Sequence, residues 1–289
     1  MTKITLLPTI AGALLACGLS AAPAHAMANR TFVSGKGTDS GTCAYAAPCR
    51  SFAFAITQTN AKGEIDVLDP AGYGAVTINR SISIVNDGVG TAGIKASSGN
   101  GVTINAGAGD SIHLRGLTIE GLGSGATGIQ FNTGGNLEIE NCVIQDFKFA
   151  GISITPTAAS AVVTGVLSNV ITNNNGDGIF VGIPPPPPGS VNVTIVDSVA
   201  SNNSGSGIHA DGPFSGALAV MVRNSVASYN GAGLRTMANA VIRVAHSVVT
   251  GNGTGVLAED NSTIFSYGDN DIDGNADNNT GALKPLAMH

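Results

Sequence analysis

The sequence contains no tryptophan, and aromatic residues make up only 4% of its 289 residues. Charged residues are also scarce, at 11%, whereas glycine occurs 40 times. This composition is unusual for a globular enzyme. Together with abundant asparagine, serine, threonine and valine, it favours short β-strands joined by tight turns.

Basic residues are outnumbered by acidic residues. Lysine and arginine total 13 against 19 aspartate and glutamate residues, which gives a formal net charge of −6. Binding to a phosphate backbone requires a basic surface, so this balance disfavours a nucleic-acid partner. The same charge would repel an acidic polysaccharide unless calcium or a local basic patch intervened.

Long apolar runs are absent beyond the N-terminus, so the sequence predicts no membrane span. Residues 1–26 have the pattern of a secretory signal peptide, with a positive start, an apolar stretch and a cleavage site at Ala24-His25-Ala26. The alternative is a lipoprotein signal, because residues 14–16 before Cys17 resemble a lipobox. We therefore expect a secreted or periplasmic protein, with lipid anchoring through Cys17 as the alternative.

Few cysteines remain after such processing. Cys43 and Cys49 flank a short loop, and export to an oxidising compartment predicts a disulfide between them. A loop this short gains little entropically, so the bridge would mainly fix local shape. Zinc binding is the rival interpretation, but no ligand cluster accompanies the pair. Cys142 sits beside a predicted strand, and we expect a buried, inert thiol.

One pattern recurs three times between Val191 and Glu259. Each copy has an alternating strand, a second short strand, an asparagine turn, and then glycine followed by a branched apolar residue, as in Gly207-Ile208. Self-similarity with a period of about 20–50 residues is typical of a solenoid. These three copies and the coils around them align on the residue that closes the first strand, at Gly116, Asn141, Asn169, Asp197, Asn224, His246 and Asn270.

Three short strands and three bends per coil, with variable coil length, predict an all-β fold, a right-handed parallel β-helix with coils about 4.8 Å apart. A β-sandwich would give no reason for the recurring asparagines. Asparagine tolerates left-handed backbone and can hydrogen-bond along a stack. One inward ladder is expected to contain Ile112, Ile139, Leu167, Ile195, Val222 and Val244. One bend is expected to carry Asn175, Asn203, Asn230, Asn252 and Asn275.

The ends of the solenoid need covers. Ser51 can cap a short helix that begins at Phe52 and places Phe52 and Ile56 on one face. We predict a signal peptide at 1–26, an N-terminal cap with the disulfide at 27–62, and coils at 63–289 that are closed by Leu283-Lys-Pro-Leu. Capped ends argue against stacking between chains, so we predict a monomer.

The opening Thr31-Phe-Val-Ser-Gly-Lys-Gly and the segments 68–78 and 114–121 resemble right-handed parallel β-helix repeat proteins of Gram-negative bacteria, within the pectate-lyase-like superfamily. The resemblance covers the mature chain and implies an exported β-helix, in a group that largely lacks assigned roles. The Asn-Thr-Asp, Asp-Asp, Gly-His-Gly and Arg-Ile-Lys motifs of polygalacturonase-like hydrolases are missing, as is the Asp-Pro-His motif of alginate epimerases. Pectate lyases use several calcium-binding aspartates and an arginine base, and no such array stands out in this sequence.

The third strand of each coil carries the first candidate site. Its outward positions form a column of Gln130, Ser153, Phe180, His209, Arg235 and Leu257. Adjacent coils should bring Asp177, His209, Asp211 and Arg235 within reach of one another. The arginine could bind the carboxylate of a uronic sugar, and Asp or His could transfer a proton. The alternative is a hydrated surface with ordinary cross-coil pairs.

The longest insertions leave from one place, after the third strand, at 155–161, 183–190 and 212–216. Such loops often mark the binding face of a solenoid. Five consecutive prolines in the second insertion predict a rigid polyproline II segment.

Two other clusters are candidate sites. On the first strand, His113 and Arg115 should stack beside Glu138 and Glu140, where an Arg115–Glu140 ion pair is the structural interpretation. Paired carboxylates suit glycoside hydrolysis only across a cleft. The aspartate run Asp269, Asp271, Asp273 and Asp277 resembles a calcium loop. However, Thr280 stands where a bidentate glutamate belongs, and the run also fits the coil register.

The absent motifs favour a non-catalytic or weakly catalytic solenoid that contacts extracellular carbohydrate or a cell-surface partner. The alternative is a polysaccharide lyase or glycoside hydrolase acting on uronate-rich glycans. The shortage of stacking aromatics argues against sugar binding. A third hypothesis is a purely structural or adhesive surface protein, which should self-associate and show no ligand response. No cofactor is predicted, apart from Ca²⁺ as a candidate.

Overall fold

The computed structural model describes residues 27–157, 162–183, 189–212, 217–279 and 282–287. The predicted signal peptide, including Cys17, lies outside the described residues, as do the prolines 184–188. Most of the predicted insertions 155–161 and 212–216 also falls there.

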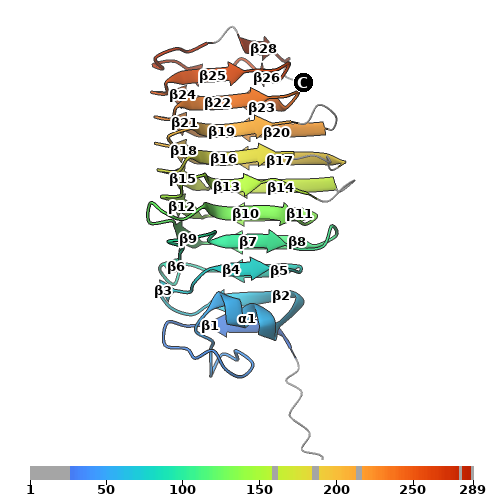
Figure 1. Cartoon of the computed structure of the whole chain (residues 1–289), viewed down its shortest axis with the longest axis vertical. Helices are drawn as coiled ribbons and strands as arrows, with labels where there is room; N and C mark the ends of the chain where they lie inside the picture. The colour runs from blue at the N-terminus through green and yellow to red at the C-terminus, as the bar shows by residue number, and fades with distance from the viewer. Residues whose placement is uncertain (1–26, 158–161, 184–188, 213–216, 280–281, 288–289) are drawn as a thin grey trace, which may run out of the picture.

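The chain winds into an elongated stack of coils, with the N-terminal segment at one end and the C-terminus at the other (Figure 1). Each complete coil contributes one strand to each of three sheets, and the strands within every sheet run parallel. Parallel crossover connections of this kind are right-handed. The predicted all-β, right-handed parallel β-helix is therefore confirmed.

The first sheet has eleven strands, in an order that follows the chain. They are β1 (Ala28–Val33), β2 (Thr59–Val67), β5 (Ile82–Val85), β8 (Ser111–Arg115), β11 (Asn136–Glu140), β14 (Val162–Ser168), β17 (Ser190–Val196), β20 (Ala217–Arg223), β23 (Val241–Ala245), β26 (Thr263–Ser266) and β28 (Leu283–Pro285).

The second sheet has nine short strands. They are β3 (Ala71–Gly72), β6 (Ala92–Lys95), β9 (Leu117–Glu120), β12 (Val143–Gln145), β15 (Ile171–Asn173), β18 (Val199–Ser201), β21 (Val226–Ser228), β24 (Val248–Thr250) and β27 (Asp271–Ile272).

The third sheet has eight strands. They are β4 (Val76–Ile78), β7 (Val102–Asn105), β10 (Thr127–Thr133), β13 (Ala150–Ile154), β16 (Asp177–Gly182), β19 (Ser206–Asp211), β22 (Ala232–Met237) and β25 (Thr254–Ala258).

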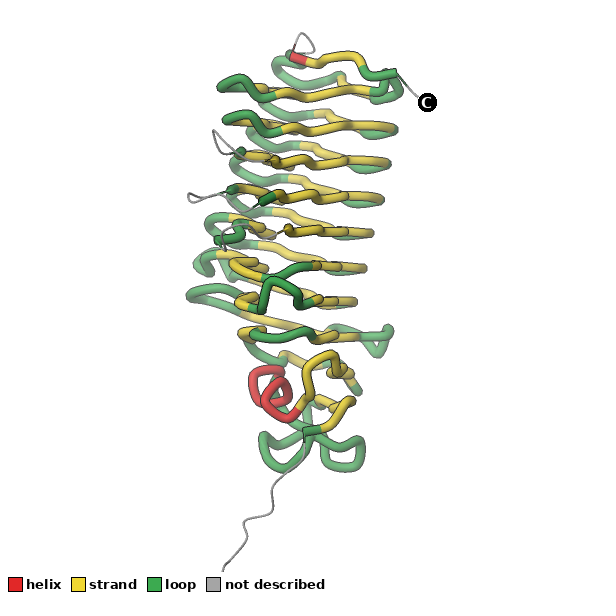
Figure 2. The backbone as a smooth tube through the Cα atoms, turned by 90° about the vertical axis from the view of Figure 1, so that its right-hand side faces the viewer, coloured by secondary structure: helices red, strands yellow, loops and turns green. Residues whose placement is uncertain are grey.

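The helix α1 (Phe52–Gln58) lies at the N-terminal end of the stack (Figure 2). The Ser51 hydroxyl accepts a hydrogen bond from the Phe54 amide at 3.2 Å, so Ser51 is the N-cap as predicted. Phe52 and Ile56 are buried, and the Phe52 ring contacts that of Tyr73 at a centroid distance of 5.1 Å. The helix thus covers the open end of the apolar column.

Aliphatic side chains stack inside the solenoid from coil to coil. Ile139, Leu167 and Ile195 are register partners along the first sheet and are fully buried. The predicted ladder was wrong at one member, because Leu114 rather than Ile112 pairs with Ile139. Ile112 pairs with Leu137 in the neighbouring inward ladder. Residues two apart on a strand both point inward, so the alternating pattern alone does not distinguish them.

Two kinds of residue close the bends. The predicted closing positions Gly116, Asn141, Asn169, Asp197, Asn224 and His246 all have positive φ angles. Asn270 differs: its side-chain oxygen accepts the Ser247 N–H at 2.9 Å. At the next bend the predicted asparagine stack is confirmed by side-chain hydrogen bonds, such as Asn252 to Asn275 at 2.8 Å. The left-handed conformation, however, belongs to the residues just before, such as Asn174 and Asn202.

Cys43 and Cys49 form the predicted disulfide, with their Cα atoms 4.8 Å apart. A disulfide is consistent with an extracellular or periplasmic protein. Cys142 is a free, fully buried thiol, and burial raises its pKa to about 12. At the far end, β28 pairs with β26, so residues 283–285 extend the first sheet. The monomeric state stays a prediction.

Candidate functional site

One surface depression lies over the third sheet, and we call it the sheet groove. It has a volume of about 590 Å³ and is lined by residues from β10, β13 and β16 and from the bends before them. The residues that matter here are Gln130, Lys148, Phe149, Ser153, Asp177 and Phe180. The predicted outward column is confirmed, since Ser153 pairs with both Gln130 and Phe180.

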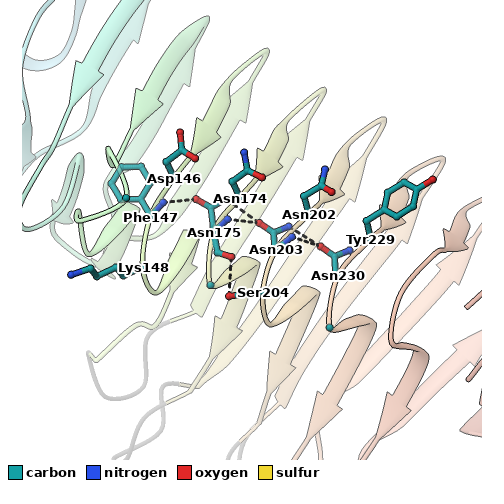
Figure 3. Close-up of a pocket in the computed structure, with 13 residues that line it drawn as sticks. Asp146, Phe147, Lys148, Asn174, Asn175, Asn202, Asn203, Ser204, Tyr229 and Asn230 are labelled. Atoms are coloured by element: carbon teal, nitrogen blue, oxygen red, sulfur yellow. Dashed lines mark hydrogen bonds between the residues drawn. The ribbon is translucent and has the colours of Figure 1, made fainter. Parts of the chain in front are cut away.

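A second depression of about 640 Å³, the bend groove, lies at the bends between the second and third sheets. Figure 3 shows its two parallel rows of side chains. The outer row is Asp146, Asn174, Asn202 and Tyr229, and the inner row is Phe147, Asn175, Asn203 and Asn230. Lys148, Gly176 and Ser204 line both grooves, so the two depressions meet at these residues.

The outer row projects outward because of its backbone. Asp146, Asn174, Asn202 and Tyr229 have φ angles of 64°, 55°, 56° and 56°. Asparagine and aspartate tolerate this left-handed region, whereas a tyrosine there is strained. Tyr229 is also 65% exposed. Its ring packs beside Gly251 of the next coil.

Sequence reasoning missed Lys148 and Phe149. Phe147 occupies the place of the stacked asparagine in its coil, because its amide donates to Asn175 Oδ1 at 3.1 Å. Lys148 and Phe149 follow, where the next coil has only Gly176 before Asp177, the register partner of Ala150. Phe149 is 70% exposed. The detectable signal was a Phe-Lys-Phe sequence at a bend that otherwise carries asparagine and small residues.

Of the four predicted site residues, the structure brings two together. His209 Nδ1 lies 3.0 Å from Asp177 Oδ2, across the β16–β19 pair. The other oxygen, Asp177 Oδ1, accepts the Ser206 amide at 2.6 Å. Gly205 leaves room for this carboxylate, since a Cβ there would lie 2.4 Å from Asp177 Oδ1. Both carboxylate oxygens of Asp177 therefore already have hydrogen-bond partners within the protein.

Arg235 and Asp211 do not join this pair. Arg235 is a register partner of His209, but its Nε lies 2.9 Å from Glu259 Oε2 in the next coil. Asp211 lies at the end of β19, and no side-chain contact links it to the other three among the described residues. The predicted acid–histidine–arginine cluster is therefore an Asp177–His209 pair and a separate Arg235–Glu259 pair.

The buried state of His209 limits its chemistry. Its side chain is 9% exposed, and the Phe180 ring packs against it at a centroid distance of 5.0 Å. Nε2 is buried without a hydrogen-bond partner. A general base must come within hydrogen-bond reach of the proton it removes. In this arrangement the imidazole stabilises the β16–β19 junction and does not face a ligand in the sheet groove.

On the outer face of the first sheet, the expected pairing of Arg115 with Glu140 was wrong. The two residues are register partners, yet Arg115 Nη2 lies 3.0 Å from Asp87 Oδ1, in the loop after β5. Glu140 instead lies 3.4 Å from His113 Nε2.

The aspartate run near the C-terminus follows the coil register. Asp271 and Asp273 are exposed, Ile272 packs against the core, and Asn275 extends the asparagine stack. The carboxylates have separate partners in the described chain: Asp269 with His246 Nδ1 at 3.1 Å, and Asp277 with the Asn279 amide at 2.9 Å. The Gly274 amide holds the pKa of Asp273 below its usual range. The candidate calcium site therefore stays a prediction without a converged ligand set.

Comparison with known proteins agrees with this architecture. The family model for the right-handed β-helix region matches residues 42–213 and 100–277, so the chain belongs to that family. A search of curated proteins found no match. Among solved structures, a crystal structure of the pectate lyase Pel9A is similar, with a TM-score of 0.61 and 18% identity over 83% of this chain and 68% of that one. At this identity the likeness concerns the fold.

Within the part of the chain that the structure describes, no helix has the length and apolar character needed to cross a bilayer.

Proposed function

We propose that this protein is an exported β-helix solenoid that binds an acidic extracellular polysaccharide and has little or no catalytic activity on it. The sheet groove and the bend groove together form the binding surface. The observation that carries the proposal is their junction at Lys148, which lies in both grooves. Two open depressions that meet at one exposed cation suit an extended ligand better than a compact one.

Charge supports an acidic ligand at this place. Lys148 is exposed, and no ion pair involves it among the described residues. Asp177, the acid in the sheet groove, is already engaged by His209 and the Ser206 amide. Lys148 is therefore an unpaired cation at the junction of the two grooves, beside Asp146 in the bend groove, on a chain of net charge −6. An acidic sugar chain would need such a cation to offset the negative charge of the protein.

The grooves also supply apolar rings and neutral polar groups. Phe149 and Tyr229 are exposed by 70% and 65%, and Phe180 lines the sheet groove. Gln130, Asn174 and Asn202 present amides that can donate to and accept from sugar hydroxyls. The similarity in fold to a pectate lyase is consistent with a polysaccharide ligand.

The second candidate function is a lyase or hydrolase that acts on uronate-rich glycans. The Asp177–His209 contact of 3.0 Å favours it, because a carboxylate can orient an imidazole for proton transfer. We prefer binding without efficient catalysis because Nε2 of His209 is shielded from the groove.

The test is the melting temperature of the mature protein with pectin, alginate, chitin and neutral glycans, each with calcium and with chelator. A ligand that binds only the folded state stabilises it by about 2.7 kcal/mol when the free ligand concentration is 100 times Kd. This stabilisation raises the melting temperature. We expect a rise with an acidic glycan that persists in chelator. Lys148→Gln and Phe149→Ala should each reduce it.

The matched control is Tyr45→Ala, which removes a ring that is also 70% exposed but lies in the N-terminal cap. Its response to glycans should equal that of the wild type. An acidic glycan that shifts all variants equally would contradict the proposed surface, and no shift with any glycan would contradict carbohydrate binding. Release of unsaturated or reducing ends that disappears in His209→Ala would favour the enzyme instead.

A further inference from the structure

His113, Glu138 and Glu140 converge on the outer face of the first sheet. One possible ligand atom from each lies within 4.8 Å of the corresponding atoms of the other two. Glu138 and Glu140 are two apart on β11, so both project from the same face. His113 is the register partner of Glu138 on β8, and its Nε2 reaches diagonally to within 3.4 Å of Glu140 Oε2.

We propose that these three side chains bind a divalent transition-metal ion, with Zn²⁺ as the reference ion. One imidazole and two carboxylates are a donor set that zinc accepts, at about 2.0–2.2 Å per bond. Tetrahedral ligands at such distances lie about 3.4 Å apart. His113 Nε2 and Glu140 Oε2 already have this separation. Glu138 is exposed, so rotation of its side chain can bring its carboxylate to the same distance from both.

The surroundings leave these carboxylates without another strong counter-charge. Arg115, the cation nearest in register, is paired with Asp87 at 3.0 Å. On the other side, the next coil places Val166 and Ser168 beside Glu138 and Glu140. Among the described residues, Glu138 takes part in no ion pair. Two carboxylates this close repel each other, and a divalent cation would relieve that repulsion.

Three protein ligands leave at least one coordination position open to water or to an external ligand. The site lies on the first sheet, whereas the sheet groove and bend groove lie along the third sheet and the bend before it. Metal binding is therefore independent of the proposed glycan binding, and either can fail without the other.

The experiment is isothermal titration of ZnCl₂ into the untagged mature protein in metal-free buffer. We expect one equivalent to bind with a Kd on the order of micromolar, about 8 kcal/mol. His113→Ala and Glu138→Gln should each weaken it by about tenfold or more. These residues are at least partly exposed, so the metal-free melting temperature should change little. Cobalt(II) should give visible absorption bands that His113→Ala removes.

The matched control is His246→Ala. It removes another accessible histidine that contacts a carboxylate, at 3.1 Å from Asp269, near the C-terminal end. Zinc binding at the proposed site should survive this change. The proposal is overturned if no zinc binds at millimolar concentration, or if His246→Ala weakens binding as much as His113→Ala. It is also overturned if Ca²⁺ binds equally well and His113→Ala retains that binding.

Discussion

The side-chain amide of Asn203 donates to Oδ1 of Asn230, 2.9 Å away, although both residues are almost fully buried. The backbone amide of Asn203 donates to the same oxygen at 3.0 Å. Asn203 in turn accepts two hydrogen bonds from Asn175, one coil earlier. Each asparagine thus satisfies polar groups of the neighbouring coil, and the stack holds adjacent bends in register.

Asn203→Ala should therefore be strongly destabilising. It would leave both amide donors of Asn175 without their acceptor and would remove the side-chain donor to the Thr172 carbonyl and to Asn230 Oδ1, which keeps only the backbone amide of residue 203. Each buried group left unsatisfied costs about 1–3 kcal/mol, so we expect a loss of roughly 3 kcal/mol or more. Chemical denaturation followed by circular dichroism measures it. Asn202→Gly is the control: it removes an exposed neighbour at positive φ and should be nearly neutral.

Tyr229→Asn should stabilise the protein and weaken glycan binding. The tyrosine has φ 56°, where an asparagine is tolerated, as at Asn174 and Asn202. Relief of left-handed strain is worth about 1 kcal/mol, offset in part by lost contact between the ring and Gly251. Thermal unfolding should show a rise of at most about 2–4 °C. A lower melting temperature would show that the ring is retained for packing.

The carboxylate of Asp69 should support the N-terminal cap in a pH-dependent way. The Gly35 amide and the Ser34 hydroxyl, each at 2.6 Å, hold its pKa below the usual value of 3.8. A group with a lowered folded-state pKa contributes stability above its unfolded pKa and loses it as the pH falls through the folded pKa.

Asp69→Asn should accordingly lower the melting temperature by about 2–4 °C at pH 6, and the difference from wild type should shrink below about pH 3. Scans from pH 2 to 7 measure it. Glu120→Gln, which removes an exposed ion pair of 3.5 Å with Lys95, should change little at any of these pH values. A difference for Asp69→Asn that does not vary with pH would contradict the assigned role of the carboxylate.

Cys142 should be inert toward thiol reagents in the native protein. Burial raises its pKa to about 12, and its thiol lies 3.2 Å from the Glu140 carbonyl. The thiolate is the reactive form and is negligible at pH 8 under these conditions. Iodoacetamide should label less than about 5% in an hour before unfolding and one thiol per chain in denaturant. Fast native labelling would mean that the coil around Cys142 opens locally.

The site was less predictable than the fold, and individual residues show why. Asp177 and His209 were placed together correctly, because both lie on the regular part of neighbouring third strands. The burial of His209 was not foreseen, since Phe180 covers it through a contact between coils. Arg235 pairs with Glu259 instead. Strand register alone could not predict this pairing, because it places several acidic residues within reach of the long arginine side chain.

The sequence by itself determined the repeat, the three strands per coil, the N-cap at Ser51, the disulfide and the asparagine stack. These features depend on local spacing or on translation from coil to coil, which appear directly as periodicity. Only the tertiary structure decided that Leu114 joins the Ile139 ladder, that Tyr229 takes a strained bend position, and that Lys148 lies in two grooves. Coils differ in length, so side chains from different coils meet only after stacking has fixed register and direction.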